Sequence, residues 1–177
     1  FDTSRGVNQI MYSDTTMESQ NTGTGNDESL SAFNSNGFSL GVDSMYGRVN
    51  YNNALFCSWT FKKQAGFFDV VTYTGNGSAR SITGLEFQPD FVWIKRRDTA
   101  KDHGLFDSVR GGTQKIESNT TAVEISGDNG KIDSFNADGF TVATGTSDNS
   151  GVNGSSNELV AWCWKAGGAP TVDNSAG

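Results

Sequence analysis

Apolar residues occur along this chain in short runs, separated by stretches rich in Gly, Ser, Thr, Asn and Asp. The runs carry Val, Ile, Phe, Trp and Thr, which are typical of pleated, half-buried strands. No segment combines a sustained 3.6-residue periodicity with helix caps. The separating residues favour turns, because they tolerate positive φ or form local side-chain to backbone hydrogen bonds. The pattern therefore predicts an all-β fold.

Four blocks of sequence occur twice, in the same order. The pairs are Phe1–Gly6 with Phe106–Gly111, Ser13–Thr16 with Ser118–Thr121, Phe33–Phe38 with Phe135–Phe140, and Trp59–Lys62 with Trp162–Lys165. Each second block follows its first copy by about a hundred residues, a usual domain size. Because the order is kept and the gaps are small, we interpret the pattern as a tandem repeat.

The repeat predicts three parts. Residues 67–168 form a complete repeat (the second unit), residues 1–66 correspond to the back two-thirds of an earlier copy (the first unit), and residues 169–177 are a linker or the start of a following segment. The segment between Phe67 and Leu105 has no counterpart before Phe1. We therefore expect the natural protein to be longer at one end or both. The missing front third of the first unit is disordered, cleaved or supplied by another chain; supply by another chain would protect an open sheet edge.

Each unit is expected to be a small antiparallel β-sandwich of the jelly-roll or lectin-like kind. The strands predicted in the complete copy are Asp69–Tyr73, Ser81–Ile82, Phe91–Lys95, Ala122–Ile125, Thr141–Thr144 and Leu159–Lys165. Turns are expected at Gly75–Gly77, Gly127–Gly130 and Asp138–Gly139.

Alternation along the last strand defines the predicted core face. It places Val160, Trp162 and Trp164 together, with Cys57, Trp59 and Phe61 as the equivalent set in the first unit. Buried aromatic side chains of this size contribute about 2–3 kcal/mol each. We therefore expect this face to anchor the core of each sandwich.

The charge of the chain argues against nucleic acid as a partner. The net charge is −7, whereas affinity for nucleic acid comes largely from Lys and Arg. The one basic cluster, Lys95-Arg96-Arg97, is followed by Asp98, and we interpret it as a solvated strand end. No apolar run approaches the ~20 residues that span a bilayer, and Phe1–Thr3 is not the start of a signal peptide. No membrane insertion is predicted.

The residues that carry chemistry are sparse, so no catalytic site, metal site or cofactor is predicted. His103 is the one histidine, and Cys-x-x-Cys and Gly-x-Ser-x-Gly are both absent. Glu86 and Asp90 come nearest to a carboxylate pair, but Pro89 interrupts the strand between them. Cys57 and Cys163 occupy non-equivalent positions of equivalent strands and are predicted to be buried free thiols.

Sugar and calcium binding stay open, and no ligand-binding residue is assigned. Trp93 and Trp162 suit stacking on sugar rings, although their strand-like alternation favours packing in a core. Calcium would suit the acidic loops, although EF-hand spacing is absent. The loop carboxylates are Asp128, Asp133, Asp138 and Asp148, and Asn-x-Ser/Thr sequons occur at Asn76, Asn119 and Asn153.

Five segments carry a family resemblance. They are Gly66–Gly75, Pro89–Arg96, Phe106–Gly111, Phe135–Phe140 and Ala161–Lys165. Together they resemble a repeat found in structural proteins of tailed bacteriophages, especially phages of marine cyanobacteria. The resemblance implies a tail-fibre-like, appendage or other virion component built from lectin-like sandwiches, and it brings no catalytic motif.

The expected function is that of a non-enzymatic virion structural component: a fibre, spike or decoration repeat on the surface of the extracellular particle. The expected partners are other virion proteins and further copies of the chain in a homo-oligomer, a trimer by analogy with fibres. The alternative is a carbohydrate-binding adhesin or receptor-binding module whose partner is a host surface glycan. A polysaccharide depolymerase would require a carboxylate cluster that the spacing does not indicate.

Overall fold

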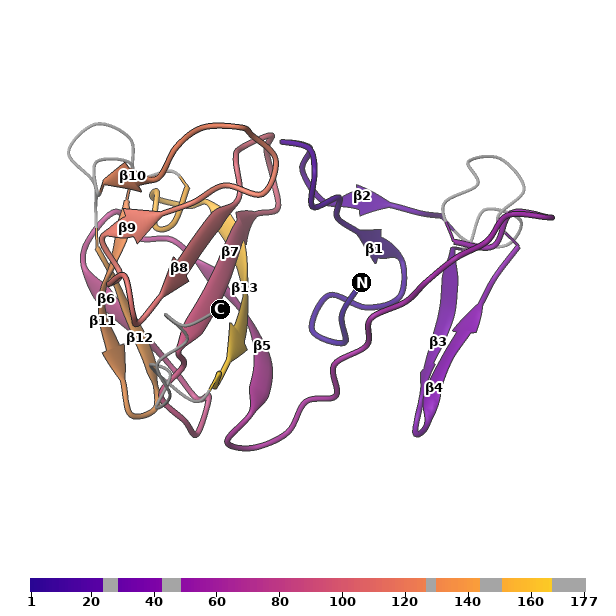
Figure 1. Ribbon diagram of the computed structural model, residues 1–177, viewed down its shortest axis with the longest axis horizontal. Coiled ribbons are helices and arrows are strands. Elements are labelled where there is room, and N and C mark those ends of the chain that lie inside the picture. Colours follow the sequence, from indigo (N-terminus) through magenta and orange to yellow (C-terminus); the bar gives the residue numbers. More distant parts are fainter. Residues whose placement is uncertain (24–28, 43–48, 127–129, 144–150, 167–177) are drawn as a thin grey trace, which may run out of the picture.

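The computed structural model of the protein describes residues 1–23, 29–42, 49–126, 130–143 and 151–166. All thirteen regular elements in these ranges are β-strands, which confirms the predicted all-β class. They form antiparallel sheets, of which the two largest belong to the second unit (Figure 1).

Two sheets enclose the core of the second unit. The larger has the strand order β5 (Phe68–Thr74), β13 (Glu158–Trp164), β7 (Phe91–Arg96) and β8 (Gly104–Asp107). The smaller has the order β11 (Lys131–Asn136), β12 (Gly139–Ala143) and β6 (Arg80–Thr83). Both sheets contribute to one cluster of buried apolar side chains, so the core lies between them.

The predicted core face of β13 is wrong, although its alternation is right. Leu159, Ala161 and Cys163 belong to the core cluster, whereas Trp162 and Trp164 lie half-buried on the opposite face. The physical reason is that this sheet is covered on both sides. Alternation groups the side chains by face, but it does not say which face meets the second sheet.

The predicted strands agree with the structure in part. Strands β5, β6, β7 and β13 lie where they were expected, and Thr141–Ala143 lie in β12. The expected strand Ala122–Ile125 is wrong, because only Ile125 is in a strand, the two-residue β10 (Ile125–Ser126), which pairs with β9 (Gln114–Lys115). Strands β8, β9 and β11 were not predicted. Thr144 and most of the predicted turn at 127–130 lie outside the described residues.

The first unit has local structures that match those of the second. Strand β1 (Gln9–Ile10) pairs with β2 (Gln20–Asn21) as β9 pairs with β10. The hairpin of β3 (Leu30–Asn34) and β4 (Gly37–Leu40) corresponds to the hairpin of β11 and β12. Both hairpins have an irregularity at the same place, between Leu30 and Ala32 and between Ile132 and Ser134. Repeated sequence therefore gives repeated local structure.

Residues 51–62 do not form the strand that the repeat predicts. They belong to no strand and are exposed throughout, with Trp59 87% exposed. The expectation that Cys57, Trp59 and Phe61 anchor a core is therefore wrong. The equivalent strand β13 lies between β5 and β7, and the described part of residues 1–66 contains no equivalent of either strand.

Candidate functional site

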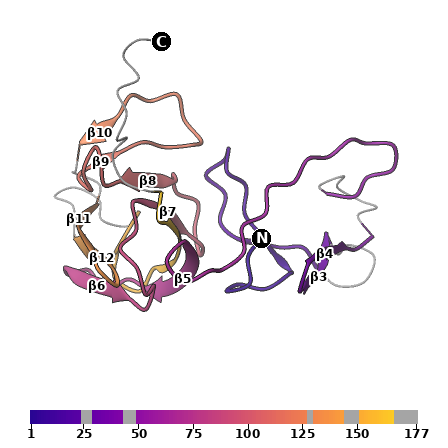
Figure 2. The ribbon, with the colours of Figure 1, turned by 60° about the horizontal axis from the view of Figure 1, so that its bottom comes forward.

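The outer face of the larger sheet is covered by the N-terminal segment, residues 1–22. In both ribbon views this segment lies between the second unit and the β3–β4 hairpin (Figures 1 and 2). Backbone hydrogen bonds tie it to the sheet's margin, from Ser19 N to Arg97 O (2.9 Å) and from Lys101 N to Thr16 O (2.8 Å). This contact between the units is the candidate functional site.

A tight turn at the start of the chain contacts Trp162. The Asp2 carboxylate accepts hydrogen bonds from Arg5 N (2.9 Å) and from the Nε1 of Trp162 (3.2 Å), and it forms an ion pair of 2.6 Å with Arg5. The Arg5 guanidinium lies 5.3 Å from the centroid of the Trp162 ring. Both charged side chains are almost fully buried, and the aromatic ring gains a hydrogen-bond acceptor and a cation.

His103 joins the N-terminal segment to the sheet. Its Nδ1 accepts a hydrogen bond from Trp93 Nε1 (2.8 Å), so its Nε2 carries the proton that is donated to the Tyr12 carbonyl (2.9 Å). Burial, with a smaller contribution from the nearby Lys95 charge, lowers the pKa of His103 to about 4. Since both nitrogens are engaged, the imidazole is held neutral as a structural link.

Lys95 is a buried cation in the same contact. Its ammonium donates to the carbonyls of Thr16 (3.2 Å) and Arg96 (3.0 Å), and its side chain is inaccessible to solvent. Burial lowers the pKa of Lys95 to about 8. The expectation that Lys95-Arg96-Arg97 is a solvated strand end is wrong for Lys95, because the N-terminal segment covers it. Arg96 and Arg97 pair with Asp98 and Glu158.

The second unit contains the same turn. Asp107 accepts from Arg110 N (2.8 Å) and binds the Arg110 side chain (2.6 Å), as Asp2 does with Arg5. The Arg110 guanidinium also binds Glu124 (2.7 Å). Here the two charged side chains of the turn are about a quarter exposed, and the neighbouring Val109 is 64% exposed. The turn is therefore built equally in both units but buried only in the first.

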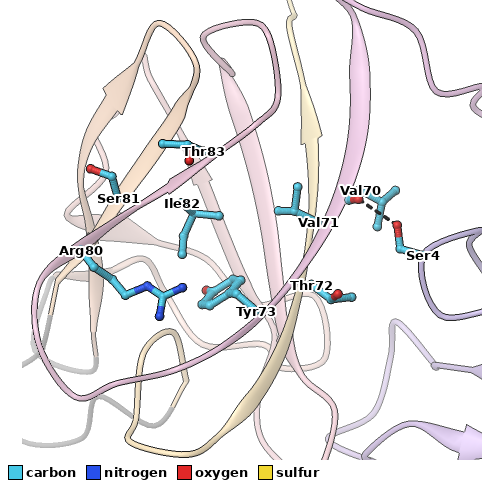
Figure 3. A pocket seen from close by; sticks show the side chains of 9 residues that line it. All are labelled: Ser4, Val70, Val71, Thr72, Tyr73, Arg80, Ser81, Ile82 and Thr83. Carbon is cyan, nitrogen blue, oxygen red and sulfur yellow. Dashed lines mark hydrogen bonds between the residues drawn. The ribbon is translucent and has the colours of Figure 1, made fainter.

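A groove lies between the edge strands β5 and β6, where the two sheets of the second unit separate. Figure 3 shows its lining, in which Ser4 donates to the Val70 carbonyl (2.8 Å) at one end. The Arg80 side chain extends over the Tyr73 ring, 5.9 Å from the ring centroid. The groove has a volume of about 490 Å³. The remaining lining residues are Val71, Thr72, Ser81, Ile82 and Thr83.

The other residues singled out in the sequence are dispersed. Cys163 is a buried free thiol as predicted, and burial raises its pKa, but Cys57 is exposed, so that prediction is wrong for Cys57. Trp93 and Trp162 lie in the contact between the units, and not in the core between the sheets. Of the sequon residues, Asn76 is exposed, Asn119 is half-buried and Asn153 is fully buried.

The acidic residues give no metal site in the part of the chain that the structure describes, which contains no group of three or more His, Cys, Asp or Glu able to hold a metal ion. Asp133 and Asp138 are exposed there, and Asp128 and Asp148 lie outside the described residues. Glu86, which with Asp90 came nearest to a carboxylate pair in the sequence, lies in a loop and has a positive φ of 62°.

Within the residues that the structure describes, no helix is long and apolar enough to cross a membrane.

One signal for the contact was present in the sequence. The runs Phe91–Ile94 and Leu159–Trp164 are almost continuously apolar, which is typical of strands that are buried on both faces. That pattern predicts a cover on the outer face. The pattern does not identify residues 1–22 as the cover. The hydrogen bonds of His103 and Lys95 to that segment are accepted by backbone carbonyls, and every residue has one, so the sequence does not reveal the partner.

Comparison with known proteins supplies the family. No curated protein and no solved structure matches the chain. The family described as "Domain of unknown function (DUF7483)" matches residues 1–67 and, a second time, residues 63–177. These two matches together span the chain, and the protein therefore belongs to this family.

Proposed function

We propose that this chain is a non-enzymatic structural component of a virion, acting as a fibre, spike or decoration repeat on the particle surface. The observation that carries the proposal is the contact between the units, in which residues 1–22 cover a sheet of the next unit with buried polar bonds. Buried polar groups that are hydrogen-bonded across a contact hold two parts in one orientation. A module of this kind suits a rigid appendage, and the resemblance to phage appendage repeats gives its setting.

Within that role, each unit acts as a jelly-roll or lectin-like sandwich in a tandem array. The chain assembles with copies of itself, as a trimer by analogy with fibres, and with other virion proteins. The acidic balance of the chain, with a net charge of −7, keeps a long array soluble.

The test is whether the protein co-purifies with virus particles. Particles are purified by density gradient from a lysate in which the gene is expressed, washed with high salt, and analysed by mass spectrometry. We expect peptides of this chain to co-sediment with capsid peptides, and antibodies against the chain to label the particle surface in electron micrographs. Recovery of the chain only from the soluble fraction would overturn the proposal.

The groove between β5 and β6 favours a second candidate, a carbohydrate-binding adhesin. Its hydroxyl-bearing side chains and the Arg80 guanidinium suit sugar hydroxyls. Tyr73 is buried beneath Arg80, so the groove offers mainly polar contacts. Host-surface polysaccharides are the matching ligands. On a glycan array, specific binding that is lost in Arg80→Ala would favour the adhesin. If no glycan binds, the adhesin is excluded and the structural role remains.

A further inference from the structure

The first unit exposes the surfaces that β5, β6 and β7 cover in the second unit. In the second unit, β13 pairs along one edge with β5 and along the other with β7, so that Trp162 lies opposite both Val70 and Trp93. The equivalent segment of the first unit, residues 54–62, is exposed along its whole length. It keeps the apolar character of β13. Its exposed large side chains are Leu55, Phe56, Trp59 and Phe61.

The β3–β4 hairpin shows the same deficit. In the second unit, β12 pairs with β6, and Phe140 is fully buried between the sheets. Among the strands that the structure describes, the equivalent strand β4 pairs with β3 alone. Its Phe38 is half-buried, and the neighbouring Phe33 is 39% exposed. The hairpin is thus complete in its own hydrogen bonds and incomplete in its packing.

A glycine marks the position of the absent strand. A Cβ on Gly139 would collide with the carbonyl oxygen of Ile82 in β6, so only glycine fits against that strand. At the equivalent Gly37, a Cβ would meet nothing within 4 Å. The φ of Gly37 also lies outside the left-handed region, so neither conformation nor space requires glycine there. A strand placed like β6 would restore the requirement.

We propose that the first unit is an acceptor for a three-strand segment of this family, with the sequence pattern of Gly66–Leu105, carried by polypeptide outside residues 1–177. Two of its strands pair with both edges of residues 54–62, and the third pairs with β4. By the register of β13, Phe56, Ser58 and Thr60 turn toward the new core, and Trp59 lies on the outer face between partners equivalent to Val70 and Trp93. This is strand addition, in which main-chain bonds give affinity and alternate side chains give specificity.

An intact second copy of this chain is not the occupant. In a folded copy, the strands of the matching segment are already paired, β5 and β7 with β13 and β6 with β12. Exchange would release one strand for every strand captured. The occupant is therefore a front segment that has no β13 of its own.

The test joins a copy of residues 66–105 directly ahead of Phe1 in the full chain. Leu105 precedes Phe106 in the second unit, so this junction reproduces the natural order at Phe1. Amide hydrogen exchange is then compared between the fusion and the original chain. We expect exchange at residues 54–62 to slow by at least about 100-fold in the fusion, because formed ladders protect amides. Amides of β13, protected in both proteins, report that the second unit is intact.

Two variants make the result specific. A fusion with residues 66–105 in scrambled order should leave residues 54–62 unprotected. Ser58→Pro should abolish the protection in the fusion, since proline removes a donor from a central strand, while leaving the original chain folded. The proposal is overturned if residues 54–62 exchange equally fast with and without the joined segment, or if they are already protected in the original chain.

This inference deepens the proposed structural role by naming a partner, but its test stands apart. If the chain co-sediments with particles but the joined segment gives no protection, only the acceptor proposal is contradicted. If the fusion is protected but the chain is not found in particles, only the proposed virion role is contradicted.

Discussion

The two units carry the same motifs but bury them to very different extents. The second unit covers its hairpin with a second sheet, and the first leaves its own hairpin partly bare. Trp162 is half-buried between Asp2 and Trp93, while its counterpart Trp59 is 87% exposed. Turns, ladders and the strand irregularity form in both. Local structure therefore follows from local sequence, whereas burial depends on strands that lie elsewhere in the chain.

Proline in β13 and in the equivalent residues 54–62 should give the largest contrast. Ala161 lies in the middle of β13 and is paired on both sides, so Ala161→Pro should cost more than about 4 kcal/mol of unfolding free energy. Ser58→Pro should cost less than about 0.5 kcal/mol, because residue 58 is in no ladder. Urea denaturation followed by circular dichroism measures both. A large loss in Ser58→Pro would mean that residues 54–62 are ordered in solution.

Truncation of the equivalent hairpin phenylalanines comes next. Phe140→Ala should destabilise the second unit by about 4 kcal/mol, since it opens a cavity in a closed core. Phe38→Ala should cost about 1 kcal/mol or less, because Phe38 is already partly exposed. Thermal unfolding of the two variants checks the difference. Equal losses would contradict the view that the first hairpin lacks cover.

The equivalent arginines should differ in the same direction. Arg5→Ala leaves the Asp2 carboxylate buried without its cation, and we expect a loss of about 3 kcal/mol. Arg110→Ala affects an ion pair that is about a quarter exposed, and should cost less than about 1 kcal/mol. Limited proteolysis of residues 1–22, alongside unfolding curves, separates undocking from global unfolding. Similar protease sensitivity in both variants would argue against a special role for the first turn.

Acid should loosen the contact between the units by a smaller amount. The pKa of His103 is about 4 when folded and about 6.5 when unfolded, so between these values the unfolded state binds more protons. Stability is therefore lost as the pH falls through this window, by about 2 kcal/mol from pH 7 to pH 5. Unfolding measured in that range, with His103→Gln as the control, should show the slope in the original chain only. An equal slope in the control would assign it to carboxylates.

Much of the fold was predictable from sequence, because alternation and turn residues are local signals. The paired blocks around Asp2 and Asp107 predicted equivalent structures, and these form the same hydrogen bonds. Short strands such as β9 have too few residues for a period-2 pattern to emerge. Strand β11 was missed because its register slips near Ile132, which interrupts the alternation.

The contact between the units was less predictable. Many of its hydrogen bonds are made by backbone atoms, and it lies on the outer face of a sheet whose other face forms the core. The bulk of Trp162 and Trp164 suggested a core face, but the small residues Ala161 and Cys163 occupy the core instead. The sequence predicts a solvated Lys95, because a charge after an apolar run usually ends a strand. Its burial depends on the Thr16 carbonyl, and a carbonyl oxygen is common to every residue type.

The contact between the units also has a direction. The Asp2–Arg5 turn of one unit packs on a tryptophan of the next, and turn and tryptophan occupy different places on a unit, so the two partners use unlike surfaces. Contacts of this head-to-tail type close into a ring only when the rotation between neighbours happens to divide a full circle; otherwise they continue as an open helix. The same turn is present again at Asp107–Arg110, so it could pack on a further unit. The length of such an array would then increase with the number of repeats in the chain.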